Sequence, residues 1–181
     1  MSSIEQIYSA LPVVASGATR HTHQSQYLSF TLSGELFALD IFRVREIIEF
    51  EKLGRVPHMP NFINGVLDLR GAAVPVVDLG VRFCKRMDEM TRGTCIIVEI
   101  VREGAQHLVG VMVDAVDEVL NIPDSAIEPT LSFGIQKRSD FISGMGKAGD
   151  QFVIILDVDC VLSLEEMSIL AEMGAGTAVP A

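Results

Sequence analysis

Few side chains in this sequence of 181 residues have the types and spacing that a catalytic site requires. Residues 144–147 read Gly-Met-Gly-Lys, but a phosphate-binding P-loop needs a further upstream glycine and a Ser or Thr after the lysine. The G-x-S-x-G motif of serine hydrolases is absent. His58 and His107 are isolated, which is typical of ordinary loop or strand-end residues. The sequence therefore predicts that the protein is not an enzyme.

Candidate metal ligands fail a similar test. His21 and His23 could chelate a metal, but two ligands on a terminal tail make a poor site. Four acidic residues between positions 157 and 166 suggest calcium, yet the glycine of an EF-hand loop is missing. Val161 and Leu162 stand where oxygen ligands would be needed. We expect no metal site and no cofactor.

Two charged residues inside apolar segments are the remaining candidates for a function. Alternation through residues 66–70 places Asp68 and Arg70 on one face of a strand and two leucines on the other. Glu46 is embedded in the apolar segment 44–48. Arg70 is either a plain surface arginine or a fixed arginine that pairs with Glu46 and shapes an interface, a role that suits its planar guanidinium.

Short β-strands must position these residues. Leu28, Phe30 and Leu32 alternate with polar residues, Ser33-Gly34 predicts a turn, and alternation resumes over residues 37–41. This pattern is typical of a β-hairpin. Runs rich in Val and Ile predict further strands at residues 74–79, 95–101, 108–113 and 152–156.

The two ends of the chain differ from this body. Residues 1–24 predict a tail that is flexible or contains one short helix over residues 4–11, and residues 25–173 form the expected domain. Ser163 and Glu166 are spaced as a capping box, so we expect a helix over residues 164–173 that packs on the body. Residues 174–181 predict a second tail.

Comparing the sequence with itself indicates an internal duplication. A shift of 72 aligns residues 38–48 with 110–120, and a shift of 79 aligns residues 62–78 with 141–157. The extra residues of the second copy lie in the connector 132–140. The coincidences that chance pairing of apolar strands explains least well are Glu46 with Glu118, Gly65 with Gly144, and Asp78 with Asp157. Two copies of about five short strands predict two small closed or nearly closed barrels with a groove at their junction.

Charge and composition exclude several classes of protein. The formal net charge of −10 opposes nucleic-acid binding, and the basic cluster of Arg82, Lys85, Arg86 and Arg92 is typical of a solvated connector. No apolar stretch approaches the roughly 20 residues of a membrane helix, so we expect no direct membrane insertion. The three cysteines are widely spaced and predict buried free thiols in a reducing compartment. The expected location is the cytoplasm.

Several segments in order resemble one known family, the CheW-like chemotaxis coupling proteins. Val-Arg-Glu-Ile at 44–47, Phe-Ile-Asn-Gly-Val at 62–66, Leu-Arg-Gly at 69–71 and Val-Pro-Val-Val-Asp-Leu at 74–79 match its first half. Residues 109–120 and 165–170 match its second half, so the resemblance spans about residues 26–172. Asp68 replaces an asparagine often seen in the family, and the N-terminal extension is long.

The resemblance implies a mainly β fold of two pseudo-symmetric five-stranded β-barrel subdomains with a C-terminal helix. It implies a non-enzymatic adaptor that couples the cytoplasmic tips of methyl-accepting chemoreceptors to the regulatory domain of the histidine kinase CheA, within membrane receptor arrays. By carry-over, the interface includes Val44, Glu46, Gly65 and Arg70. The duplication adds Ile47, Val113 and Val116 as expected walls of the groove, where an amphipathic receptor hairpin would dock.

Two other functions remain open at this point. One is a CheW-like adaptor in a non-flagellar chemosensory pathway, which controls pili motility or gene expression. The other is a purine-binding module, for which the sequence offers little base stacking because it has no Trp and only two Tyr.

Overall fold

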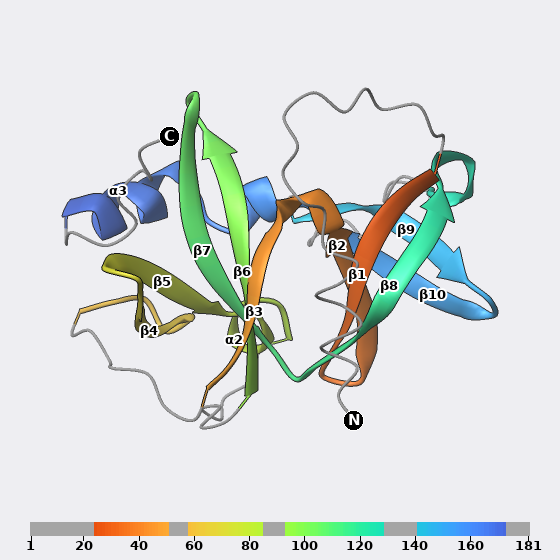
Figure 1. The fold of residues 1–181 in the computed structure, drawn as a ribbon, viewed down its shortest axis with the longest axis horizontal. Helices are drawn as coiled ribbons and strands as arrows, with labels where there is room; N and C mark the ends of the chain where they lie inside the picture. Colours follow the sequence, from red (N-terminus) through yellow and green to blue (C-terminus); the bar gives the residue numbers. More distant parts are fainter. Residues whose placement is uncertain (1–23, 51–57, 85–92, 129–140, 173–181) are drawn as a thin grey trace.

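The computed structural model describes residues 24–50, 58–84, 93–128 and 141–172, which contain ten strands in two five-stranded sheets (Figure 1). The strands are β1 (Gln24–Leu32), β2 (Glu35–Asp40), β3 (Val44–Phe50), β4 (Ile63–Leu69), β5 (Ala72–Asp78), β6 (Gly93–Arg102), β7 (Ala105–Val113), β8 (Ala115–Pro123), β9 (Ile142–Ala148) and β10 (Gln151–Leu156). The helices are α2 (Leu79–Cys84) and α3 (Leu164–Glu172), with short 3-10 turns η1 (Ile41–Arg43), η2 (Asp124–Ala126) and η4 (Val158–Cys160). The expected tails, the short helix over residues 4–11 and the connector 132–140 fall almost entirely outside the described residues.

The expected fold of two five-stranded β subdomains is confirmed, but neither copy of the duplication forms a subdomain alone. Sheet A has the order β8-β1-β2-β10-β9, and sheet B has the order β3-β6-β7-β5-β4. Each sheet therefore combines the first hairpin of one copy with the last three strands of the other. The chain leaves sheet A after β2 and enters sheet B through η1, which lies between the two halves in Figure 1.

Neither sheet closes fully into the expected barrel. In sheet A no strand pairing joins the edge strands β8 and β9 within the described residues; instead Glu128, which follows β8 and η2, exchanges two backbone hydrogen bonds of 2.8 Å with Met145 of β9. The parallel pairs β2–β10 and β5–β7 hold each hairpin against the strands of the other copy. The result is a strongly curved open sheet in each half rather than a closed barrel.

Both faces of the central strands are buried. The largest apolar cluster lies between the sheets and takes Leu28, Phe30 and Leu32 from β1 together with Ile96 and Val98 from β6. On the opposite faces, smaller clusters fill the curve of each sheet. One of these clusters surrounds Cys95 and Met112 in sheet B, and the other surrounds Tyr27 and Ile122 in sheet A. The alternation predicted for β1 is therefore present, although its second face is buried as well, including Ser29 at 0% exposure.

Backbone hydrogen bonds repeat at equivalent positions of the two copies. The amide of Asp78 donates to Phe62 O at 2.7 Å, and the amide of Asp157 donates to Phe141 O at 2.8 Å. Each aspartate then caps the turn that follows its strand, because its carboxylate accepts from the amide of Val81 or Asp159. These paired contacts agree with the duplication expected from the sequence.

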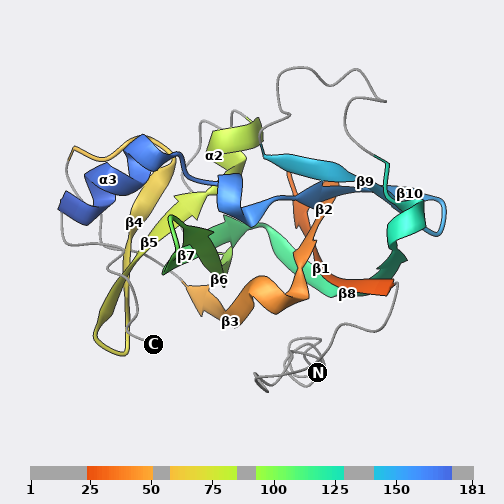
Figure 2. The same cartoon turned by 90° about the horizontal axis from the view of Figure 1, so that it is seen from above.

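The closing helix α3 begins as the sequence predicts. Ser163 N donates to Glu166 Oε2 at 2.7 Å, and Glu166 N donates to Ser163 Oγ at 3.1 Å. The reciprocal pair satisfies two amide donors that would otherwise lack partners at the start of a helix. In Figures 1 and 2, α3 lies alongside sheet B near β4 and β5.

Candidate functional site

A β-bulge sets the direction of the Glu46 side chain. Val44 pairs with Val98 and Glu46 pairs with Ile97, so β3 holds one extra residue, Arg45, opposite a single step of β6. Bulges bend a strand and redirect its side chains. Arg45 also forms an ion pair with Glu99, which helps to hold this bulge in place.

A second bulge lies beside Gly65 on β4. Ile63 pairs with Val77 and Gly65 pairs with Val76, so Asn64 is the extra residue. Gly65 itself is buried. Both β3 and β4 are edge strands of sheet B, which places the two bulges at opposite edges of one curved sheet.

Arg70 lies in the turn between β4 and β5, and not on the strand face that alternation predicts. Arg70 and Gly71 have φ values of 51° and 88°. Two positive φ values in a two-residue hairpin are the pattern of a type I′ turn, which favours Asn-Gly, because an L side chain in the left-handed region is strained. The carboxylate of Asp68 supports the turn by accepting from Gly71 N at 2.9 Å. The sequence missed this placement because alternation carries no information about where a strand ends.

The ion pair expected between Glu46 and Arg70 is present. Arg70 Nη2 lies 3.5 Å from Glu46 Oε2, and the two side chains are 82% and 27% exposed. The pair joins the opposite edges of sheet B, since Glu46 is on β3 and Arg70 is at the tip of the β4–β5 hairpin. At this exposure the pair contributes only about 0.2–1 kcal/mol to stability. Most of the Arg70 guanidinium is therefore open to a partner.

The apolar residues expected at the interface lie deeper than the ion pair. Val44, Ile47 and Val113 are 6%, 4% and 0% exposed and belong to the cluster between the two sheets. Val116 is half-buried and packs against the same cluster. Val44 and Val116 hold equivalent places, because Val44 is the first residue of β3, Val116 is the second residue of β8, and each lies just before the bulge of its strand. The structure thus brings the four residues to the junction of the sheets, mostly on its inner side.

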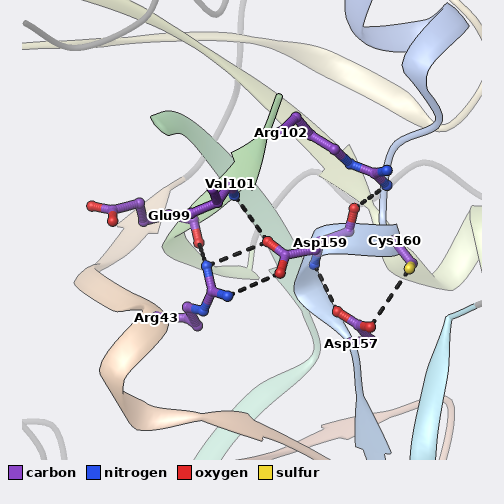
Figure 3. Close-up of polar contacts among 7 residues, drawn as sticks. All are labelled: Arg43, Glu99, Val101, Arg102, Asp157, Asp159 and Cys160. Atoms are coloured by element: carbon purple, nitrogen blue, oxygen red, sulfur yellow. Dashed lines mark hydrogen bonds and ion pairs between the residues drawn. The ribbon is translucent and has the colours of Figure 1, made fainter. Parts of the chain in front are cut away.

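A network of polar contacts at this junction has no signal in the sequence. Asp159 of η4 binds Arg43 of η1 at 2.9 Å, and Asp159 Oδ1 accepts from the amide of Val101 at 2.9 Å (Figure 3). Arg102 donates to the carbonyl of Asp159 and, at 3.1 Å, to that of Leu162. Asp157 and Asp159, which suggested calcium, instead bind backbone amides and arginine. The network therefore ties η1, where the chain crosses from sheet A to sheet B, to η4 at the end of the second copy.

Cys95 and Cys160 are free and poorly ionised. Burial raises the pKa of the Cys95 thiol to about 12. The pKa of Cys160 is also raised, mainly by burial and then by the negative charge of Asp157, whose carboxylate accepts from the thiol at 3.6 Å. Thiolates are the nucleophilic and metal-binding form, so these thiols are unreactive near neutral pH.

Within the described ranges, no three His, Cys, Asp or Glu side chains are grouped so that they could hold a metal ion. In this part of the chain, no helix combines the length and the hydropathy needed to cross a membrane.

Comparisons with known proteins agree with one another. Residues 26–166 match the family model of the CheW-like domain. A chemotaxis protein CheW from Klebsiella aerogenes is 34% identical over 145 residues, which cover 80% of this chain and 86% of that protein. One from Bacillus subtilis is 33% identical over 137 residues, covering 75% of this chain and 85% of that protein. The crystal structure of the scaffolding protein TtCheW from Thermoanaerobacter tengcongensis superposes with a TM-score of 0.66 at 34% identity, and covers 75% of this chain and 90% of that one.

Proposed function

Because this chain belongs to the CheW-like family, we propose that it is a non-enzymatic adaptor in chemotaxis signalling. It couples the cytoplasmic tips of chemoreceptors to the regulatory domain of the histidine kinase CheA. Its location is then the cytoplasm, at membrane receptor arrays, and residues 25–173 form the functional domain. The relatives named chemotaxis protein CheW and the scaffolding protein TtCheW support this assignment.

The observation that carries the proposal is the exposed guanidinium of Arg70 in a turn that disfavours arginine. Arg70 retains a positive φ of 51°, pairs with Glu46 across the two edges of sheet B, and leaves 82% of its side chain exposed. Arginine is enriched among the residues that dominate protein interfaces.

The seven candidate residues divide into two roles by their burial. Arg70 and Glu46 are the accessible groups that contact a partner, and Val116 is half-buried at the junction of the sheets. Val44, Ile47, Gly65 and Val113 lie inside and set the shape of the surface rather than touch the partner. An amphipathic helical hairpin has both a polar face for Arg70 and an apolar face for half-buried Val116.

The test is a reconstitution of the kinase with a receptor signalling fragment, with and without this protein. Receptor-dependent change in kinase autophosphorylation should require the protein, and both partners should co-purify with it. Equal autophosphorylation in both mixtures would remove the adaptor function. Kinases and receptors from flagellar and non-flagellar pathways, tested separately, identify the pathway by which pair responds.

A further inference from the structure

Arg82 lies at the meeting point of both copies of the duplication. Its guanidinium carbon is 4.2 Å from the centre of the Phe62 ring and 5.2 Å from that of Phe141. These distances fit cation–π contacts, which require about 6 Å or less. Phe62 directly precedes β4 and Phe141 directly precedes β9, at equivalent positions of the two copies. The solvated connector expected from the basic cluster is therefore wrong for Arg82, whose side chain is only 11% exposed.

The same guanidinium binds the first turn of α3. Arg82 Nη1 and Nη2 lie 2.9 Å and 3.0 Å from Glu166 Oε1 and Oε2, which is a two-point pair. Glu166 is also the residue that caps α3, because its Oε2 accepts from Ser163 N. One carboxylate thus closes the capping box and anchors the helix to Arg82. Charge-assisted pairs of this geometry are stronger than neutral hydrogen bonds.

The helix α3 is short and needs tertiary contacts to stay docked. The helix has nine residues, and helices shorter than about 12–15 residues are marginal in water without tertiary packing. Met167 packs against the apolar cluster between the sheets, whereas Ile169 is 37% exposed. Among the described side chains, the pair between Arg82 and Glu166 therefore provides the charged anchor of α3.

We propose that Arg82 and Glu166 form a latch that couples α3 to both halves of the molecule. When the pair opens, α3 is released, and the segments that begin β4 and β9 lose their shared cation at the same time. A single arginine can serve both rings because the two equivalent phenylalanines face one point between the halves. The latch is a conformational device of the fold and does not depend on which partners the protein binds.

Hydrogen–deuterium exchange of the full chain, resolved by peptide, tests the latch. Arg82→Met keeps an unbranched apolar stem and removes the charge. It should speed exchange by about tenfold or more in three regions, residues 164–172, 58–66 and 141–148. Strands β6 and β7 should exchange as in the wild type, which distinguishes local release from global unfolding.

Two matched variants separate the latch from simpler explanations. Ser163→Ala weakens the helix cap but not the arginine pair, so only α3 should exchange faster. Lys147→Met removes the cation–π contact between exposed Lys147 and Phe152, 5.9 Å apart, and should leave all three regions unchanged. If Arg82→Met accelerates α3 alone, Arg82 is only a helix anchor and the coupling is wrong.

Glu166→Gln keeps the size of the side chain and removes its charge, so it tests the latch even if Arg82→Met does not fold. It should accelerate the same three regions, and normal exchange there would overturn the proposal. Where both variants fold, the double variant should exchange no faster than the faster single variant, because both changes open one latch. Multiplied effects in the double variant would show that Arg82 and Glu166 act independently.

Discussion

Replacing Arg70 with asparagine separates the guanidinium from the turn that carries it. Arg70→Asn removes the ion pair with Glu46, which at 82% exposure of the arginine contributes about 0.2–1 kcal/mol. The same change relieves the positive φ of 51°, because asparagine tolerates the left-handed region whose cost for most residues is about 1–2 kcal/mol. The two effects oppose each other. We expect stability between unchanged and about 1 kcal/mol higher, which is a rise in melting temperature of up to about 2–4 °C.

Glu103→Asn is the matched control for this change. Glu103 and Gly104 form the β6–β7 turn with φ values of 51° and 78°, so the backbone effect of asparagine is the same there. Glu103 is exposed and lies on the hairpin of the other copy, away from Glu46. Both variants should therefore melt at or above the wild-type temperature. Only Arg70→Asn should weaken binding to the receptor fragment or the kinase regulatory domain, by about tenfold, or ~1.4 kcal/mol.

Melting by circular dichroism and binding by co-sedimentation give the two readouts. If Arg70→Asn binds both partners as well as Glu103→Asn does, then Arg70 is the plain surface arginine and the proposed interface is wrong. If Arg70→Asn instead melts more than about 5 °C below the control, the guanidinium supports the fold itself. The stability argument from its exposure would then fail.

Four further predictions test other parts of the structure. The charge swap Glu46→Arg/Arg70→Glu should be more stable than either single variant, but it should not bind the partners. Full recovery of binding would mean that the ion pair only holds the two edges of sheet B together. Val116 is half-buried, so Val116→Asp should fold and should weaken receptor binding by about tenfold or more. Val44 is only 6% exposed, so Val44→Asp buries a charge and should lower the free energy of unfolding by more than about 3 kcal/mol in urea denaturation. Asp159→Ala should cost about 1.5–3 kcal/mol in the same assay, because it removes the acceptor of Arg43 and of the Val101 amide, and a loss below 0.5 kcal/mol would contradict the role of the junction network. Because the pKa of Cys95 is about 12 in place of 9.0, its thiol should be alkylated about a thousandfold more slowly than an ordinary thiol at pH 8. The alkylation rate, measured by peptide mass spectrometry, should rise as the pH approaches 12. Rapid labelling in the folded protein would show that the thiol is not buried.

Local features of the sequence predicted much of the secondary structure. Alternation located β1 and β2, because a strand with a buried face needs an apolar residue at every second position. Runs rich in Val and Ile located β5, β6, β7 and β10. The capping box located the start of α3, since the Ser163 and Glu166 contacts depend only on their spacing of three residues. The equivalent pairs Gly65 with Gly144 and Asp78 with Asp157 indicated the duplication, because each copy has a bulge beside its glycine and a turn capped by its aspartate.

The candidate site was predicted in part. Glu46 and Arg70 were paired from the sequence because charged groups within apolar segments usually need a partner. Their alternation could not show that Arg70 lies in a turn, because the end of β4 is set by the geometry of the hairpin. The burial of Val44, Ile47 and Val113 at the junction also depends on how the two sheets face each other, which no local pattern records.

By itself, then, the sequence determined where most strands, the first turn and the closing helix form, indicated that the unit is repeated, and singled out the charged residues that need explanation. Only the tertiary structure decided that the copies exchange strands, that Arg43 meets Asp159 across 116 positions, and that Arg82 meets Glu166 across 84. Strands, caps and turns depend on neighbours along the chain, so periodicity and spacing reveal them. Contacts between distant residues depend on which strand edges pair and which faces pack. The pairing of strand edges and the packing of faces are set by the burial of apolar surface over the whole domain, and no single position of the sequence records that burial.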